Sequence, residues 1–233
     1  MITLDEINLS QVASFSKKQR FYLQYPRQKV YDALFMAYKA EVLSRIVSYQ
    51  DEDLSRIKIE IDEARLSSIA AWITNSIGKP GLLLYGDVGT GKTTALKAFC
   101  RVINACCFAE REDCRLDDGK KMISIVRAKD VVSAYQNDSE RYKRMLYAEM
   151  IAIDELGVEA IDVKTYGNSN EPIIDLLSHR YDTQKITAVS SNLDLDQINE
   201  RYGLRLADRF NEMFHKVGFV GASYRGYANK DKK

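Results

Sequence analysis

One stretch of the chain combines glycines, a lysine and threonines at a spacing that suits phosphate binding. Glycines allow successive backbone N–H groups to converge on phosphate oxygens, and Lys92 adds a positive charge beside the β- and γ-phosphates. The hydroxyl of Thr93 can ligate Mg²⁺. The residues expected to bind nucleotide in this way are Gly86, Asp87, Val88, Gly89, Thr90, Gly91, Lys92, Thr93 and Thr94.

The neighbours of this loop are those that a phosphate-binding loop needs. An apolar run at 82–85 comes directly before it. A helical spacing of apolar residues follows it, in Ala95, Phe99, Val102 and Cys106. Because a chance glycine-rich turn would require neither neighbour, the strand, loop and helix together predict a P-loop that binds a nucleoside triphosphate.

A second chemical signal is the apolar run 150–153, which ends in two adjacent carboxylates, Asp154 and Glu155. A strand end would hold Asp154 where it helps to position Mg²⁺, while Glu155 polarises water for attack on the γ-phosphate. The other interpretation is a strand end with solvated acids. Beside an independent P-loop, the pair predicts the Walker B element of an ATPase.

Two further signals depend on their order along the chain. The apolar run 186–190 leads to Asn192, which could orient the attacking water or touch the γ-phosphate, although Ser-Ser-Asn also marks strand exits and turns. Arginines follow in the segment 202–210 and at Arg225. Arginine suits stabilisation of charge on a transferring phosphoryl group. The alternative is that these are surface arginines paired with nearby carboxylates.

Together these elements resemble the AAA+ ATPases of the DnaC and IstB group. The resemblance is carried by the P-loop, the Asp-Glu pair, the strand ending in asparagine, an Asp-Arg-Phe helix and a terminal Ser-Tyr-Arg, over about residues 81–227. It implies an α/β P-loop NTPase core of AAA+ type, with a five-stranded parallel sheet of order 5-1-4-3-2. It also implies an active site shared between subunits, and so a homo-oligomer in the ATP state.

The resemblance assigns roles by position. Lys92 and Thr93 would bind phosphate and Mg²⁺, and Asp154 would support the metal. Glu155 would be the catalytic base, and Asn192 resembles sensor 1. The implied activity is hydrolysis of ATP to ADP and phosphate, stimulated by DNA or by a partner.

Arginine roles follow in the same way. Arg209 resembles the arginine finger that reaches the nucleotide of a neighbouring subunit, with Arg205 as a competing candidate. Arg225 resembles the sensor 2 arginine, which acts on the subunit's own nucleotide. The core nevertheless lacks the full helical lid of many larger AAA+ proteins.

The pattern divides the chain into two units. Residues 1–77 contain no glycine and are mostly helical in pattern, whereas strands alternate with helices from Gly81 onward. We therefore expect a helical N-terminal region, 1–77, and an ATPase core, 78–233. The resemblance implies that the N-terminal region docks a partner, and the alternative is that it simply packs against the core. The strands expected in the core are 82–85, 122–126, 150–153, 186–190 and 214–220.

Two long helices are expected in the N-terminal region. The first should begin near Pro26, with an apolar stripe of Val30, Leu34, Tyr38, Val42 and Ile46. The second should follow Asp53 and end near Trp72, with a buried stripe of Leu54, Ile57, Ile61 and Ala64. The long polar loop 157–170 is assigned no role.

Composition bounds the remaining possibilities. The chain has 233 residues with 45% apolar and 29% charged side chains, which is typical of a globular protein. No apolar run approaches the roughly 20 residues that span a bilayer, and the polar, acidic start is not that of a signal peptide, so we expect a cytoplasmic protein without a membrane partner. Four cysteines without paired ligand spacing indicate reduced thiols instead of a metal site.

With a formal net charge of +1, contact with nucleic acid must come from a local patch. Residues 130–148 interleave aromatic and basic side chains, a mixture that suits single-stranded DNA, and the resemblance places an initiator-type helical insertion there. Equally, the tyrosines could pack on the sheet while the basic residues face water. The side chains in question are Tyr135, Arg141, Tyr142, Lys143, Arg144 and Tyr147.

The resemblance implies single-stranded DNA as one partner and a replicative helicase of the DnaB type or a transposase as the other. Three functions stay open at this stage. They are a helicase loader in DNA replication, an IstB-like ATPase helper of a transposase, and an ATP-regulated binding switch with slow hydrolysis. The sequence sets neither oligomer size nor DNA polarity.

Overall fold

A computed structural model describes residues 21–46, 62–109, 122–165 and 168–221. Its helices are α2 (Arg27–Ile46), α3 (Glu63–Ile73), α4 (Lys92–Ala109), α5 (Ala128–Asn137), α6 (Ser139–Tyr147), α7 (Pro172–Asp182), α8 (Leu195–Tyr202) and α9 (Leu204–Met213). Its strands are β1 (Gly81–Gly86), β2 (Ser124–Arg127), β3 (Met150–Leu156), β4 (Val163–Thr165), β5 (Asn168–Asn170), β6 (Ile186–Ser191) and β7 (Phe214–Phe219).

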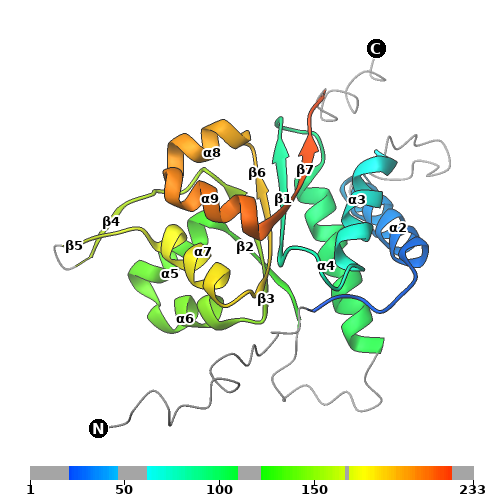
Figure 1. The fold of residues 1–233 in the computed structure, drawn as a ribbon, viewed down its shortest axis with the longest axis horizontal. Helices are drawn as coiled ribbons and strands as arrows, with labels where there is room; N and C mark the ends of the chain where they lie inside the picture. The colour runs from blue at the N-terminus through cyan, green and yellow to red at the C-terminus, as the bar shows by residue number, and fades with distance from the viewer. Residues whose placement is uncertain (1–20, 47–61, 110–121, 166–167, 222–233) are drawn as a thin grey trace, which may run out of the picture.

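Five parallel strands form the central sheet in the order β2-β3-β6-β1-β7. Read from β7 and numbered among themselves, these strands have the expected order 5-1-4-3-2. The short antiparallel hairpin β4–β5 lies outside this sheet, within the loop 157–170, and was not predicted. Because the strands are parallel, their carboxyl ends share one edge, at the top of Figure 1.

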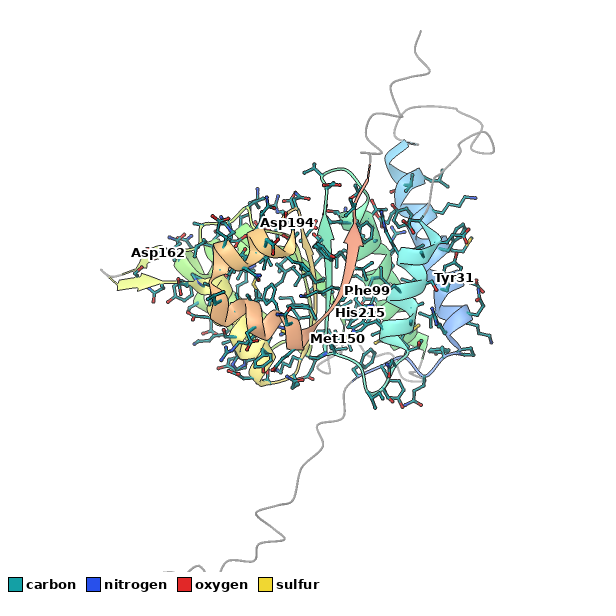
Figure 2. The ribbon with its side chains drawn as sticks, turned by 45° about the horizontal axis from the view of Figure 1, so that its top comes forward. Tyr31, Phe99, Met150, Asp162, Asp194 and His215 are labelled. Carbon is teal, nitrogen blue, oxygen red and sulfur yellow. The ribbon has the colours of Figure 1, made fainter. Side chains whose placement is uncertain are left out.

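Helices cover both faces of the sheet. On one face, α2, α3 and α4 enclose a cluster that contains Leu82 and Leu84, with Phe99 and Met150 among its members (Figure 2). On the other face, α5 to α9 enclose a second cluster that contains Leu83. The alternation along 82–84 follows from the two-residue period of a strand and makes β1 a strand buried on both sides.

The first N-terminal helix is confirmed. Helix α2 begins at Arg27, directly after Pro26, and Val30, Leu34 and Tyr38 of its predicted stripe are buried in the cluster shared with α4 and the sheet. Glu41 of α2 forms a 2.9 Å ion pair with Arg101 of α4. The described part of residues 1–77 therefore completes one face of the core.

The second N-terminal helix differs from the expectation. The segment after Asp53 falls outside the described residues, and α3 begins at Glu63, where the Asp62 side chain accepts the N–H of Arg65. Ala64, expected in the buried stripe, is exposed. Its position lies about 200° around the helix from Leu66, where the buried face starts. Trp72 lies near the end of the helix, as expected.

Strand β2 is also shifted from its predicted span, 122–126. The side chain of Asn104 accepts the N–H of Ile123 at 2.9 Å and donates to its carbonyl at 3.1 Å. Since both backbone groups of Ile123 are occupied, pairing with β3 begins only at Ser124.

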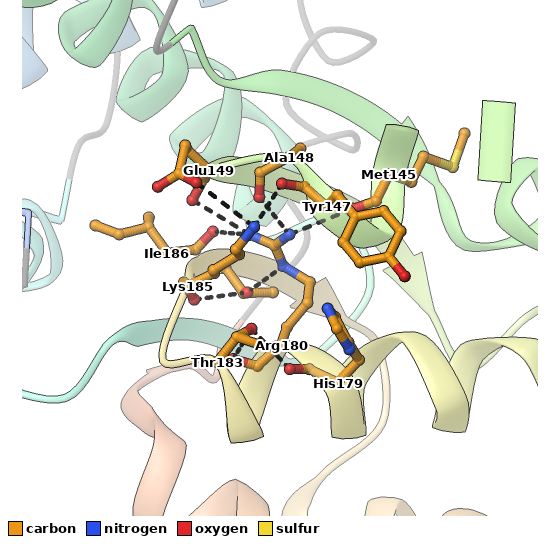
Figure 3. A network of polar contacts seen from close by, with 10 residues as sticks. Met145, Tyr147, Ala148, Glu149, His179, Arg180, Thr183, Lys185 and Ile186 are labelled. Atoms are coloured by element: carbon orange, nitrogen blue, oxygen red, sulfur yellow. Dashed lines mark hydrogen bonds and ion pairs between the residues drawn. The ribbon is translucent and has the colours of Figure 1, made fainter. Parts of the chain in front are cut away.

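A buried arginine fixes the opposite edge of the sheet (Figure 3). Arg180 of α7 is 0% exposed, and burial lowers the pKa of its guanidinium to about 10. It donates to the hydroxyl of Thr187 at 2.7 Å and to the carbonyls of Met145, Ala148, Glu149 and Ile186. These acceptors come from α6, the α6–β3 connection and β6, so one side chain holds the amino-terminal ends of β3 and β6 together.

Candidate functional site

The P-loop joins β1 to α4 at the carboxyl edge of the sheet. Gly86, Gly89 and Gly91 have φ values of +122°, +83° and +92°, a region that side chains other than glycine rarely adopt. A Cβ at Gly86 would also lie 2.6 Å from the carbonyl oxygen of Phe219. The glycines are therefore required by the backbone path, which turns into the amino terminus of α4 and presents it to the loop.

Lys92 lies inside this loop. Its buried ammonium donates to the carbonyl oxygens of Gly86 at 2.9 Å and Asp87 at 2.6 Å. The hydroxyl of Thr90 donates to the same Asp87 carbonyl at 2.7 Å. Thr94 is buried, whereas Val88 is exposed. A positive charge is thus concentrated at a helix amino terminus, an arrangement that binds anions.

The end of β7 is tied to the P-loop. The backbone N–H of Asp87 donates to the carbonyl of Phe219, and its carboxylate accepts the N–H of Gly221, each at 3.0 Å. Arg225, the sensor 2 candidate, lies outside the described residues. The last described residue, Gly221, lies beside the P-loop.

The carboxylate of Asp154, the Walker B candidate, contacts the loop that was expected to bind phosphate. The Thr93 hydroxyl donates to Oδ1 of Asp154 at 3.0 Å, and the carboxylate is buried. Strand β3 continues to Leu156, so Asp154 and Glu155 lie within it instead of after its end. A hydroxyl and a carboxylate are the hard oxygen ligands that Mg²⁺ takes, together with phosphate oxygens and water.

Glu155 adopts an unusual backbone conformation at this edge. Its φ is +61°, and its side chain is exposed. Pairing of β3 with β6 shifts register between Ile153 and Leu156, which marks a β-bulge at Asp154 and Glu155. Such a bulge re-aims a side chain, here into solvent.

A residue that the sequence analysis did not single out contacts both carboxylate-bearing residues. The hydroxyl of Ser190 donates to Oδ1 of Asp154 and accepts the N–H of Glu155 at 3.1 Å. Its signal in the sequence was its place two residues before Asn192. Asn192 itself is exposed and follows β6, which lies between β3 and β1, so it sits at the sheet edge between Walker B and the P-loop.

The finger candidates lie on α9. The guanidinium of Arg209 stacks on the Tyr181 ring at 5.2 Å and lies 3.8 Å from the carboxylate of Asp182, both of α7. These two contacts belong to α7, not to the P-loop. The backbone of Arg205 is helical in α9, but its side chain is outside the described part.

The aromatic and basic segment forms the helix pair α5 and α6. Tyr142 is buried, its hydroxyl donates to the Pro172 carbonyl at 2.8 Å, and its ring meets that of Tyr135 edge-on at 5.0 Å. These two tyrosines therefore pack inside the fold. The basic and aromatic side chains left exposed on α6 are Arg141, Lys143, Arg144 and Tyr147. The acidic Glu140 is exposed beside them and forms a 2.9 Å ion pair with Lys143.

The comparisons with known proteins identify the fold. No protein-family description matches the chain, and no curated protein does. Among solved structures, the DnaC helicase loader superposes with a TM-score of 0.51 at 18% identity, over 77% of this chain and 98% of that one. DnaI superposes with a TM-score of 0.50 at 18% identity, over 74% of this chain and 89% of that one.

The chain has the fold of the DnaC helicase loader and of DnaI. The expected α/β class with a parallel sheet is confirmed. Within the described residues, no helix is both long and apolar enough to cross a membrane. The same residues hold no cluster of three or more His, Cys, Asp or Glu side chains suited to a metal.

Proposed function

We propose that this AAA+ protein binds ATP with Mg²⁺ at the P-loop, hydrolyses it, and acts on a replicative helicase at single-stranded DNA during the initiation of replication. The observation that carries the proposal is the meeting of Lys92, Thr93 and Asp154 at one edge of a sheet with the DnaC fold. No other arrangement among the described residues combines a buried ammonium at a helix amino terminus with an oxygen pair for a divalent cation.

Each residue has a physical task in this proposal. Lys92 and the loop amides bind the β- and γ-phosphates, while Thr93 and Asp154 hold Mg²⁺. The metal, when bound, neutralises charge that develops on the phosphate oxygens. Glu155 takes a proton from the attacking water, and Asn192 orients that water. The exposure of Glu155 at the edge suits this task because water must reach it.

The DNA contact is proposed for the exposed face of α6. Arg141, Lys143 and Arg144 supply charge for the phosphates, and Tyr147, 58% exposed, supplies a ring for a base. Tyr135 and Tyr142 are not part of this contact, because they pack inside the fold. This assignment is narrower than the six residues that the sequence suggested.

Partner docking is proposed for the N-terminal region, 1–77, and the ATP state is proposed to be a homo-oligomer in the cytoplasm. In it Arg209 would leave Tyr181 and Asp182 and reach a neighbour's nucleotide, with Arg225 acting in its own subunit. The name helicase loader belongs to DnaC, and the match covers 98% of the DnaC chain in that structure. This similarity supports the helicase as partner over a transposase. The IstB-like helper shares the same ATPase core and is separated by the tests below.

The first test is ATP binding and steady-state hydrolysis by the full chain. Lys92→Ala should weaken binding of a fluorescent ATP analogue at least about tenfold, whereas Lys97→Ala, in the next turn of α4, should not. Glu155→Gln should retain binding and lower turnover by about 100-fold or more. Binding that survives Lys92→Ala would contradict the site.

The second test concerns DNA and assembly. Reversing the charges of Arg141, Lys143 and Arg144 should weaken single-stranded DNA binding and flatten its salt dependence, while reversing Lys29 and Lys39, exposed on α2, should not. DNA should stimulate turnover, and Arg209→Ala should remove that stimulation. Turnover indifferent to DNA and Arg209, without ATP-dependent assembly in a sizing experiment, would leave an isolated P-loop ATPase. Stimulation by a transposase but not by a helicase would favour the helper function.

A further inference from the structure

Ser190 of β6 is the single residue that lies opposite the bulge in β3. Ile153 pairs with Val189, and Leu156 pairs with Ser191, so the two residues between them on β3 oppose the single residue Ser190 on β6. In a bulge of this kind the extra residue loses its partner in the ladder. The unpaired group here is the N–H of Glu155, and Ser190 Oγ accepts it at 3.1 Å.

The bulge changes which side chain enters the core. Ile151 and Ile153 lie in the cluster beneath α5 and α7, and a regular strand would place Glu155 on that same face. Instead Leu156 occupies the cluster, 1% exposed, and Glu155 is left outside it. The insertion of one residue thus allows the strand to remain buried while its carboxylate faces solvent.

This geometry is strained and requires support. A φ of +61° is disfavoured for any side chain with a Cβ, and it persists only where surrounding contacts fix it. Ser190 is 2% exposed, and its single hydroxyl both donates to Asp154 and accepts from Glu155. Asp154 Oδ1 accepts a second hydroxyl from Thr93 at 3.0 Å, so Ser190 reaches the metal-side carboxylate as well as the base.

We propose that Ser190 is a positioning residue for ATP hydrolysis, whose hydroxyl holds the β3 bulge so that Asp154 faces Thr93 while Glu155 faces the attacking water. This inference rests on the proposed ATPase function. Ser190 touches neither substrate nor metal in this account and acts through the two acids. Partners of this kind, one shell away from a metal ligand, contribute about 10- to 100-fold to activity or metal affinity.

The test compares two buried serines in the same strand. Ser190→Ala should lower kcat by about 10- to 100-fold and change the dissociation constant of Mg²⁺-free nucleotide by less than about threefold. Ser191→Ala is the control: it is 0% exposed, and its hydroxyl donates to the Leu156 carbonyl at 2.7 Å and accepts the N–H of Leu193 at 3.1 Å. This variant removes the same hydroxyl oxygen from an equally buried site, and that hydroxyl has no hydrogen bond to Asp154 or Glu155. Its kcat should stay within about threefold of that of the unmodified protein.

A second readout does not depend on turnover. With a non-hydrolysable ATP analogue, Ser190→Ala should raise the Mg²⁺ concentration for half-maximal tight binding several-fold, and Ser191→Ala should not. If Ser190→Ala does not fold, Ser190→Cys keeps the size of the side chain with a weaker hydrogen-bonding group and should show the same direction of change. Equal effects of the two serine variants, or none from Ser190→Ala, would overturn the role of Ser190. Absence of turnover in the unmodified protein would overturn the proposed function, and the Mg²⁺ titration would still decide on Ser190.

Discussion

Glu155 has a backbone conformation that is unusual for a residue with a side chain. Residues with a Cβ cost roughly 1–2 kcal/mol in the left-handed region, whereas glycine enters it freely. At φ +61° the usual ranking of alanine above glycine in a strand should therefore reverse. The departure lies next to the residue that would hold the metal.

The first prediction concerns this strain. We expect Glu155→Gly to be about 1 kcal/mol more stable to urea than Glu155→Ala. At Lys216, inside β7, alanine should instead be the more stable of the two replacements. The measurement is the free energy of unfolding of each pair, and alanine exceeding glycine at 155 would show that the bulge imposes no such strain.

The second prediction concerns the protonation of the buried Cys100 thiol. Burial, followed by the negative charge of Asp154, raises the pKa of its thiol to about 12. The value in an unfolded chain is about 8.5, so the folded state favours the protonated thiol. The contribution to stability is complete below about pH 8.5 and is lost as the pH rises toward 12.

We therefore expect the unmodified protein to lose more stability than Cys100→Ala between pH 8 and 10.5 in urea titrations. In addition, Cys100 should resist alkylation in the folded state at pH 8, as followed by peptide mass. Rapid modification of Cys100 without unfolding would contradict its buried, protonated state.

Among the elements, the Arg180 network joins α7, α6 and the starts of two strands. We predict that Arg180→Met lowers the free energy of unfolding by about 3 kcal/mol, because several buried carbonyls lose a charged donor. Arg141→Met, on the exposed face of α6, should change it by less than about 0.5 kcal/mol. Urea denaturation of both variants checks this prediction. Equal free energies of unfolding for the two variants would show that the Arg180 network does not stabilise the fold.

An element could be predicted from the sequence where the residues that cause it lie within a few positions of one another. The P-loop, β1, β6 and β7 could be placed from the sequence because glycine spacing and apolar runs act over a few residues. The bulge at Glu155 could not, since it exists only against Ser190 on another strand. The polar β4–β5 hairpin lacked an apolar signal. Ala64 had an apolar signal that misled, because the buried face of α3 starts at Leu66. Arg209 and Asn192 were assigned by their order in the chain, and their roles remain predictions.

For the molecule as a whole, α2 belongs to the core that supports the P-loop helix. Leu34 is 0% exposed in the cluster with α4, whereas Met36, two residues later, is 64% exposed. We predict that Leu34→Ala costs about 2–5 kcal/mol of stability and Met36→Ala less than about 0.5 kcal/mol. Thermal or urea unfolding checks the pair, and a small loss for Leu34→Ala would indicate that α2 folds apart from the core.

The burial of β6 at all six positions sets limits on motion. Flanked by β3 and β1 and covered on both faces, it has the fewest routes to local opening, while β2 is a short edge strand with three exposed residues. Its amides should thus exchange with solvent slowest, close to the rate of global unfolding. The strand that carries Ser190 and leads to Asn192 is then the part of the described structure that is least free to open, so we expect the response to nucleotide in the loops and helices around it.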